Sequence, residues 1–281
     1  MTENMAENRA SSPSLSPARS VDLNGFLSTL LSRQLPVLVL PIATAFAFLL
    51  LWQAIAVGGN ISATILPSPT MILEQLTSNF PLIMKHTIPT TMETLLAFGI
   101  SIPLGIALAA LMVYSATAYQ ALYPNIIFFQ LIPKIALAPL FIVWLGIGPS
   151  SRITFSIFIC FFPILIATVA GLKSVEPNML RLCRSLRMST WQVLVRIRFP
   201  SSPPFVFSGM KVAVTLAIIG VVVGEFIASQ RGLGYLILFA SSRQQTDLAL
   251  ACIAVLCVVG LALYGAVVLA EKAVMKLYDF S

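Results

Sequence analysis

Apolar residues are gathered into long blocks along the chain, and short polar or charged stretches separate these blocks. Each block has about twenty residues, which is the length that an α-helix needs to cross a hydrocarbon core about 30 Å thick. The pattern predicts an all-α fold, a polytopic membrane protein with six transmembrane helices. We expect the spans at about residues 34–57, 89–114, 121–145, 153–172, 205–227 and 248–270.

The stretch before the first block, residues 1–33, is rich in Ser, Pro and Asn and predicts a mostly disordered cytoplasmic tail. The first block ends in Ala-Ile-Ala at residues 54–56, which resembles a signal-peptidase site. However, the block is longer than the roughly 7 to 15 residues of a signal sequence and starts too far into the chain. We therefore expect a retained span, with residues 34–281 forming one transmembrane domain.

The overall composition, 58% hydrophobic and only 10% charged, excludes a water-soluble enzyme domain and a disordered chain. The sequence contains no phosphate-binding GxxxxGK[ST] loop, no metal-spaced His/Cys cluster and no nucleophile triad, so we expect neither an enzyme nor a metal site. The four cysteines lack CxxC spacing and are typical of small apolar side chains. They are Cys160, Cys183, Cys252 and Cys257.

The chain carries 17 Lys and Arg against 10 Asp and Glu, a net charge of +7. In a soluble protein this excess would suggest nucleic-acid binding, but in a membrane protein basic residues collect in cytoplasmic loops. A cytoplasmic N-terminus places twelve basic residues inside and four outside, with Lys134 in a span. We therefore expect both termini in the cytoplasm. Seven of the twelve lie between Lys173 and Lys211.

The cytoplasmic loop 173–204 holds a predicted amphipathic helix. Ser174 is a capping residue, and Glu176 and Pro177 suit a first turn. Four apolar side chains then recur at the spacing of one helical face, while arginines lie on another face. The apolar residues are Met179, Leu182, Cys183 and Leu186, and the arginines are Arg181, Arg184 and Arg187.

A second helical piece is predicted over residues 191–198, capped at residues 189–190 and terminated by Pro200, Pro203 and Pro204. Two interpretations of this loop stay open on composition alone. Either the basic helix lies on anionic lipid headgroups, or a soluble partner grips it, with the apolar face in a groove and the arginines at acidic groups on its rim.

The stretch from Glu176 to Pro204 resembles the signature region of permease subunits of bacterial ABC importers. It is most similar to the branch that moves nitrate, sulfonates, taurine and related small solutes. Further matching segments extend the resemblance over most of the chain from Thr87 to Lys272. They are residues 130–140, 144–148, 162–165, 208–213, 223–226 and 232–237.

The family's loop reads roughly Glu-Ala-Ala, then Gly, then a closing Ile-x-Leu-Pro, and forms a coupling helix held by the ATPase subunit. Residues 181–183 stand at the Glu-Ala-Ala position, residues 197–200 match the closing motif, and Arg187 replaces the glycine. Either the turn is built differently here, or the ATPase groove suits a more basic helix. The resemblance implies an ATPase-coupling set of Glu176, Met179, Arg181, Leu182, Cys183, Arg184, Leu186 and Arg187.

The resemblance also implies the type I ABC importer permease fold in the bacterial inner membrane. The implied partners are two cytoplasmic subunits that hold ATP and Mg, an extracytoplasmic substrate-binding protein, and a second permease copy in a homodimer. A sulfonate, taurine, nitrate or similar anion is the expected cargo, and a pyrimidine or vitamin precursor is the alternative. An ion-coupled secondary transporter is the alternative of a different class, but the inverted repeats and coupling acids of that class are not evident.

Two ionisable residues within the spans are candidates for the translocation path. Lys134 lies between Pro133 and Pro139, where the helix can open, so it either attracts an anion there or serves a structural role by snorkelling or pairing with Glu225. Glu225 matches an acidic position of the family, with gating, helix pairing or simple interface exposure as its alternatives.

Four other residues carry simpler expectations. Glu93 is expected at the outer headgroup level, and His86, the only histidine, is expected in an exterior loop. Gly220 and Gly224 have the spacing of a small-residue helix contact, and a contact between two permease copies is one interpretation.

Overall fold

A computed structural model describes residues 23–59 and 61–277, with side chains from residue 39 onward. Helices make up this part of the chain and no strand occurs in it, which confirms the all-α fold. Five of the described helices are long and apolar enough to cross a membrane, and a sharply bent pair supplies a sixth crossing if it counts as one span. Residues 1–22 of the predicted tail lie outside the described residues.

The first helix, α1 (Leu23–Gly58), is described by itself. Its apolar portion, Val39–Gly58, is long enough to span a membrane. The sequence pattern suggested disorder up to residue 33, whereas the structure is helical from residue 23. The leucines between residues 23 and 31 favour helix, and no proline interrupts them.

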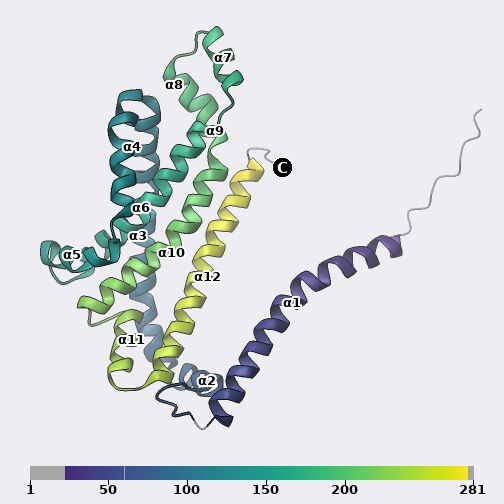
Figure 1. Cartoon of the computed structure of the whole chain (residues 1–281), viewed down its shortest axis with the longest axis vertical. Helices are drawn as coiled ribbons and strands as arrows, with labels where there is room; N and C mark the ends of the chain where they lie inside the picture. The colour runs from purple at the N-terminus through teal and green to yellow at the C-terminus, as the bar shows by residue number, and fades with distance from the viewer. Residues whose placement is uncertain (1–22, 60, 278–281) are drawn as a thin grey trace, which may run out of the picture. The chain divides into compact units, whose positions relative to one another are not determined.

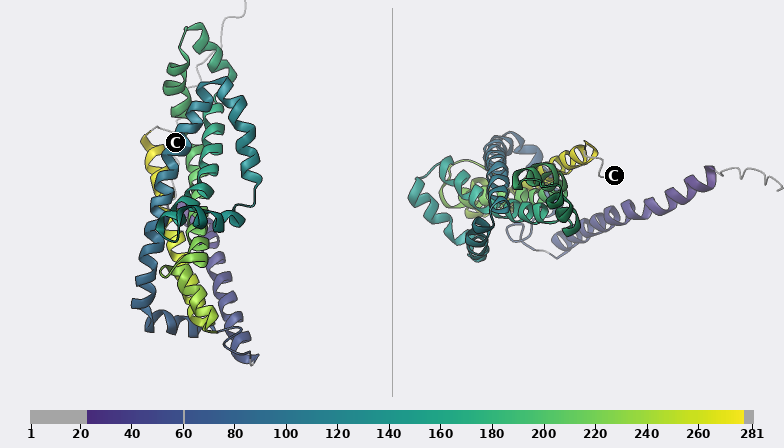
Figure 2. Two further views of the ribbon diagram at one scale, coloured as in Figure 1. Left: turned by 90° about the vertical axis from the view of Figure 1, so that its left-hand side faces the viewer. Right: turned by 90° about the horizontal axis from the view of Figure 1, so that it is seen from above.

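The remaining helices form a bundle centred on α6 (Pro149–Lys173). It packs mainly against α3 (Phe80–Tyr114) and α10 (Pro203–Ala228), and α12 (Thr246–Leu277) packs on α10. Two shorter helices, α2 (Pro69–Ser78) and α11 (Leu233–Ser242), pack against α12 at one end of this bundle. Figure 1 and the left view of Figure 2 place loop 173–204 at the opposite end. We call the end with α2 and α11 the far end.

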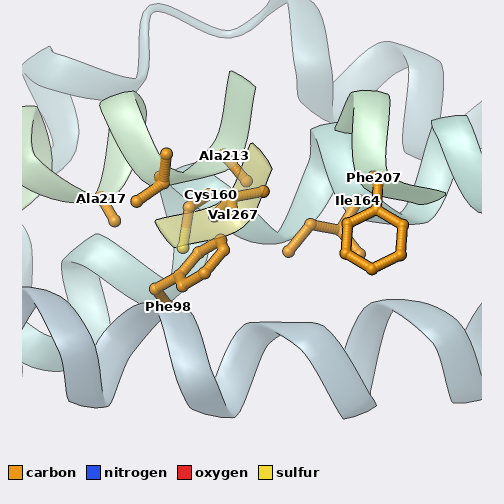
Figure 3. Packing of buried hydrophobic residues seen from close by; sticks show 8 residues of the cluster. Phe98, Cys160, Ile164, Phe207, Ala213, Ala217 and Val267 are labelled. Carbon is orange, nitrogen blue, oxygen red and sulfur yellow. The ribbon is translucent and has the colours of Figure 1, made fainter. Parts of the chain in front are cut away.

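The central packing joins α3, α6, α10 and α12 through buried apolar side chains (Figure 3). Small residues let these helices approach closely, as is common in bilayers. A Cβ built on Gly105 of α3 would lie 2.8 Å from the Ile164 side chain, and one on Gly209 of α10 would lie 2.6 Å from Ala167. The buried cluster consists of Phe98, Cys160, Ile164, Phe207, Ala213, Val214, Ala217 and Val267.

The small-residue pair on α10, Gly220 and Gly224, packs against α6 of the same chain. A Cβ on Gly220 would lie 2.7 Å from Ser156, and one on Gly224 would lie 2.8 Å from the Arg152 side chain. Both partners belong to α6. The interpretation of this pair as a contact between two copies is therefore wrong, because its face is already covered within the bundle.

The third predicted span is broken. It consists of α4 (Ala116–Leu131), a short 3-10 turn (Lys134–Leu137) and α5 (Ala138–Leu145), with a bend of 86° between the two halves. Proline lacks a backbone N–H and disfavours helix at the residue before it. Pro133 directly follows Ile132, where α4 ends.

The other spans differ from the expected ranges mainly at their ends. The helix α3 begins nine residues before the expected position 89, because Pro89 lies inside the helix instead of opening it. Similarly, α12 continues to Leu277 and α6 starts at Pro149. These extensions place His86 and Arg152, which lie outside the expected spans, within helices of the bundle. Glu93 lies further from the start of its helix than expected.

Candidate functional site: the loop 173–204 and a buried polar network

The predicted amphipathic helix in loop 173–204 is present as α7 (Pro177–Ser185). Glu176 is its N-cap and Pro177 opens its first turn. Ser174 does not cap this helix, because its hydroxyl donates to the Gly171 carbonyl at 2.8 Å and so belongs to the end of α6. The start of α7 is therefore set by Pro177, whose fixed φ and missing N–H suit a first helical position.

The faces of α7 are only partly covered by the bundle. Cys183 is buried, whereas Met179, Leu182 and Leu186 are 44%, 54% and 66% exposed. The side chains of Glu176, Arg181, Arg184 and Arg187 are exposed as well. Among the described residues none of these three arginines forms an ion pair. This helix thus presents an uncovered apolar surface edged with unpaired positive charge.

Arg187 ends α7 in a left-handed conformation, with φ of 53°. The Met188 N–H donates to the Cys183 carbonyl at 3.0 Å, and the Arg187 N–H donates to the Arg184 carbonyl at 2.9 Å. These two bonds are those of a Schellman motif, in which glycine is the usual left-handed residue. The turn is therefore not built differently: an arginine takes the conformation that glycine adopts at least cost.

The second predicted helical piece runs past Pro200 and ends shortly before Pro203. It begins as α8 (Thr190–Val193), continues as a π-turn (Leu194–Arg198), and ends as α9 (Phe199–Ser201). Ser189 and Gln192 form a capping box at its start. Pro200 lies in the first turn of α9, so the expectation that it terminates this piece is wrong, whereas the piece does end at Ser201, shortly before Pro203 opens α10.

The loop is fastened to the bundle through Arg198. Its Nη1 donates to the Leu172 carbonyl of α6 at 3.1 Å. Partial burial lowers the pKa of the Arg198 guanidinium, which stays charged at neutral pH because the ordinary value is so high. The hydrogen bond of Arg198 joins the loop to the end of α6.

Lys134 lies at the break between α4 and α5. Its Nζ donates to the Gln130 carbonyl at 2.8 Å and lies 5.2 Å from the centre of the Phe162 ring. The Gln130 carbonyl needs this donor because the helix ends before an N–H four residues later can supply the bond. No ion pair between described residues joins Lys134 to Glu225, so the pairing considered from the sequence is not formed.

Glu225 is buried near the far end of α10 and is 1% exposed. Its Oε1 accepts a hydrogen bond from the Thr90 hydroxyl and its Oε2 accepts one from the Gly234 N–H, both at 2.7 Å. Thr90 also accepts from the Leu233 N–H at 2.8 Å. The carboxylate therefore ties α10 to α3 and to the start of α11, which excludes simple interface exposure.

The same network contains the two residues expected at the surface. His86 is buried, with Nδ1 3.1 Å from the backbone N of Gly232, and its ring stacks on Tyr235. Glu93 is 5% exposed and pairs with Arg152. The expectation that His86 lies in an exterior loop is wrong, because α3 starts earlier than its apolar block and includes this residue, while Glu93 is covered by protein. Within the described ranges no cluster of His, Cys, Asp or Glu is arranged to hold a metal ion.

Residues 101–276 match the family model described as "Binding-protein-dependent transport system inner membrane component". The match covers the helices α6, α10 and α12 and the whole loop 173–204. The chain belongs to this family of ABC permeases. Such a permease is a multi-pass inner-membrane transport subunit, not an enzyme, and its family implies ATPase and substrate-binding partners. Membership of this family does not favour the alternative function, that of an ion-coupled secondary transporter.

Several named permeases are similar over most of their length. A probable ABC transporter permease protein of Haemophilus influenzae is 34% identical and covers 81% of this chain and 93% of its own. The riboflavin transport permease RibX of Chloroflexus aurantiacus is 33% identical over 86% and 90%. The taurine transport permease TauC of Escherichia coli is 31% identical over 82% and 85%.

The importer permease fold is also seen in solved structures. The MetNI methionine ABC transporter in an inward-facing conformation aligns with a TM-score of 0.59, covering 72% of this chain and 98% of that chain, at 15% identity. This likeness confirms the predicted type I importer permease fold.

The sequence pattern predicted the helix in loop 173–204, but it did not predict most of the buried hydrogen bonds and the ion pair at the far end of the bundle. Thr90 lies within an apolar block and carries no charge, so nothing marked it as a partner for Glu225. The signal that was available is the placement of Glu93 and Arg152. One acid and one base at the same end of the second and fourth spans are candidates to pair, because a single charge is costly in lipid.

Proposed function

We propose that this permease carries a small anionic solute of the sulfonate, taurine or nitrate type across the inner membrane. An external binding protein delivers the solute, and two cytoplasmic subunits that bind ATP and Mg drive the transport. A second copy of this chain completes the path as a homodimer. The observation that carries the proposal is the loop 173–204, whose helix α7 offers an uncovered apolar surface edged with arginines.

The coupling role of α7 is supported by its exposed apolar side chains and by its arginines, which have no acidic partner among the described residues. Met179, Leu182 and Leu186 each expose two fifths or more of their surface, and burying such side chains in a groove stabilises a contact by about 25 cal/mol per Å². Arg181 and Arg184 have no acidic partner among the described residues. Carboxylates on the rim of an ATPase groove would satisfy them through charge-assisted hydrogen bonds.

The test is co-purification of the ATPase subunits with this permease. Changing Leu182→Asp together with Leu186→Asp is expected to abolish association, because two charges replace the apolar surface. Ser185→Asp is the matched control, since it adds an acid to the same helix without touching those leucines. Full association of the double variant would contradict the coupling role. It would favour a helix that lies on anionic lipid headgroups.

The anionic cargo is supported by the likeness to the taurine permease and by Lys134, a cation at the broken span. Riboflavin is a second candidate, supported by two observations. The riboflavin permease is similar over a longer stretch, 245 residues against 236. A cavity of about 640 Å³ between α3, α5 and α6 is also lined by apolar residues that include Phe141, Phe158 and Phe161. Such a lining suits a planar ring.

ATP hydrolysis by the reconstituted complex distinguishes these cargoes. The complex contains this permease with its ATPase subunits and its binding protein. Taurine or methanesulfonate is expected to stimulate hydrolysis, and riboflavin is not. Stimulation by riboflavin alone would assign the aromatic cargo instead.

The proposed orientation places both termini in the cytoplasm. It rests on the excess of basic residues in loop 173–204 and near the chain ends. An alkaline-phosphatase fusion at residue 190 is expected to be inactive, because the enzyme folds only outside the cytoplasm, and an active fusion would reverse the orientation.

A further inference from the structure

A cavity of about 530 Å³ lies at the far end of the bundle, away from the loop that carries α7. One wall comes from α3, through Lys85 and His86, and the other comes from Arg231 and Tyr235, which precede and begin α11. Its size is within the range of small-ligand sites, which run from about 300 to 1,000 Å³. It lies outside the loop 173–204 and does not include Lys134.

The cavity carries two cations and no acid in its lining. Lys85 and Arg231 are exposed, and neither forms an ion pair with a described residue. The other two basic residues toward this end are already engaged. Arg152 pairs with Glu93, and the Arg243 guanidinium lies 4.2 Å from the centre of the Phe239 ring. Lys85 and Arg231 are therefore the two cations of this end for which no ion pair or ring contact is formed with a described residue.

The wall between the two cations is held in place. The His86 and Tyr235 rings stack with their centres 5.8 Å apart, and the Gly232 N–H lies 3.1 Å from His86 Nδ1. The Gly232 carbonyl oxygen lies at the same distance of 3.1 Å from Nδ1, so backbone atoms of Gly232 engage this ring nitrogen in either tautomer. The wall therefore adds a fixed aromatic surface to the two charges.

Glu225 is a buried acid beside Gly232, and it does not cancel this charge. It is not part of the lining, and its oxygens already accept hydrogen bonds from Thr90 and Gly234. The two cations of the lining outnumber this one carboxylate. The field in the cavity consequently favours a negative ligand.

We propose that this cavity binds an oxyanion group, a carboxylate, sulfonate or phosphate, carried by a free solute or by a lipid headgroup. Arginine offers a planar fork that matches such a group, and lysine adds a mobile point charge. The inference goes beyond the proposed function, because it assigns a ligand site to the permease itself and needs neither the ATPases nor the binding protein.

The experiment measures binding to the full chain in nanodiscs of phosphatidylcholine, with methanesulfonate and inorganic phosphate as probes. Saturable binding is read by calorimetry and by the shift of the thermal unfolding midpoint. The variant Lys85→Gln with Arg231→Gln is expected to weaken binding by about tenfold or more, the usual effect of losing charge-assisted hydrogen bonds. Arg243→Gln is the matched control, because it removes a cation outside the cavity.

A second arm replaces the lipid with anionic phosphatidylglycerol. If free probes do not bind, but this lipid stabilises the wild-type chain and not the double variant, the oxyanion site stands and its source is a lipid headgroup. Free-probe binding that is equal in the wild-type chain and in the double variant overturns the proposal. Absence of any effect of probe or lipid also overturns it, even if ATPase association is normal.

Discussion

Arg152 of α6 forms two parallel hydrogen bonds with Glu93 of α3. Its Nε donates to Oε2 at 2.8 Å and its Nη2 donates to Oε1 at 2.6 Å. Both side chains are buried, and the pair fastens the two helices at the far end of the bundle. The bidentate geometry satisfies both charges at once, which is what makes an ion pair tolerable in a low-dielectric interior.

Removing one member of this pair is expected to be costly. Glu93→Gln leaves the Arg152 guanidinium buried without a counter-charge, and breaking such a pair costs about 3–5 kcal/mol. We expect a clear fall of the thermal unfolding midpoint in detergent. The double change Glu93→Gln with Arg152→Met removes both charges and is expected to recover much of the loss. Equal loss in the single and the double variant would contradict the pairing argument.

Any substitution that gives residue 232 a side chain is expected to destabilise the protein. Its φ is 107°, and a Cβ would collide with the carboxylate of Glu225. Gly232→Ala therefore combines backbone strain of about 1–2 kcal/mol with displacement of the buried acid. Gly146→Ala is the control, because Gly146 also has a positive φ, 81°, but open space around its Cβ. Unfolding midpoints that fall equally in both variants would show that strain alone matters.

The glycines of α10 are predicted to matter for packing. Gly220→Ala and Gly224→Ala place a methyl group against Ser156 and Arg152 of α6 and are expected to lower stability. Gly265→Ala in α12 has open space and is expected to raise it by roughly 0.5–1 kcal/mol, since glycine weakens a helix interior. Thermal unfolding of the three variants checks this order. Destabilisation by Gly265→Ala as large as by Gly220→Ala would contradict it.

The sequence predicted the helical class and the loop 173–204 because both depend on local patterns. Blocks of apolar residues require lipid, and a helical spacing of Met179, Leu182 and Leu186 requires an amphipathic helix. The positions that it misjudged depend on tertiary contacts. His86 precedes the apolar block of α3, so the pattern predicts an exterior loop there, and the charge of Glu93 near the start of the block predicts the headgroup level. The partners that allow them to be buried, Gly232 and Arg152, lie far along the chain.

The break at Lys134 was only partly visible. Pro133 and Pro139 indicated that the span can open, but not that the two halves diverge by 86°. The angle depends on the packing of α5 against α6. No local rule supplies that packing.

Lys134→Gln tests whether that break lines the anion path. If the ammonium attracts the cargo, transport of taurine or methanesulfonate by the reconstituted complex is expected to fall several-fold while the permease stays folded, because glutamine can still donate to the Gln130 carbonyl. Lys173→Gln, which changes a cation at the loop end of α6, is the control. Unchanged transport and anion preference in Lys134→Gln would remove this residue from the path.

Arg187 is predicted to lower the stability of the permease and to strengthen its association with the ATPases. Glycine adopts a φ of 53° without the steric cost that arginine bears, so Arg187→Gly is expected to stabilise the chain by about 0.5–1 kcal/mol. Gln244 ends α11 at a φ of 59° with the same pair of backbone bonds, which makes Gln244→Gly a matched control. Both variants should unfold at higher temperature.

Only Arg187→Gly is expected to weaken association with the ATPases, and more so at low salt, where a surface charge contributes most. Co-purification of the ATPases at two salt concentrations measures this difference. Arg187→Lys separates charge from shape, since it keeps the charge and the left-handed strain but loses the planar fork. If Arg187→Gly is both more stable and fully associated, the arginine contributes nothing to the contact, and its strained position has no functional explanation.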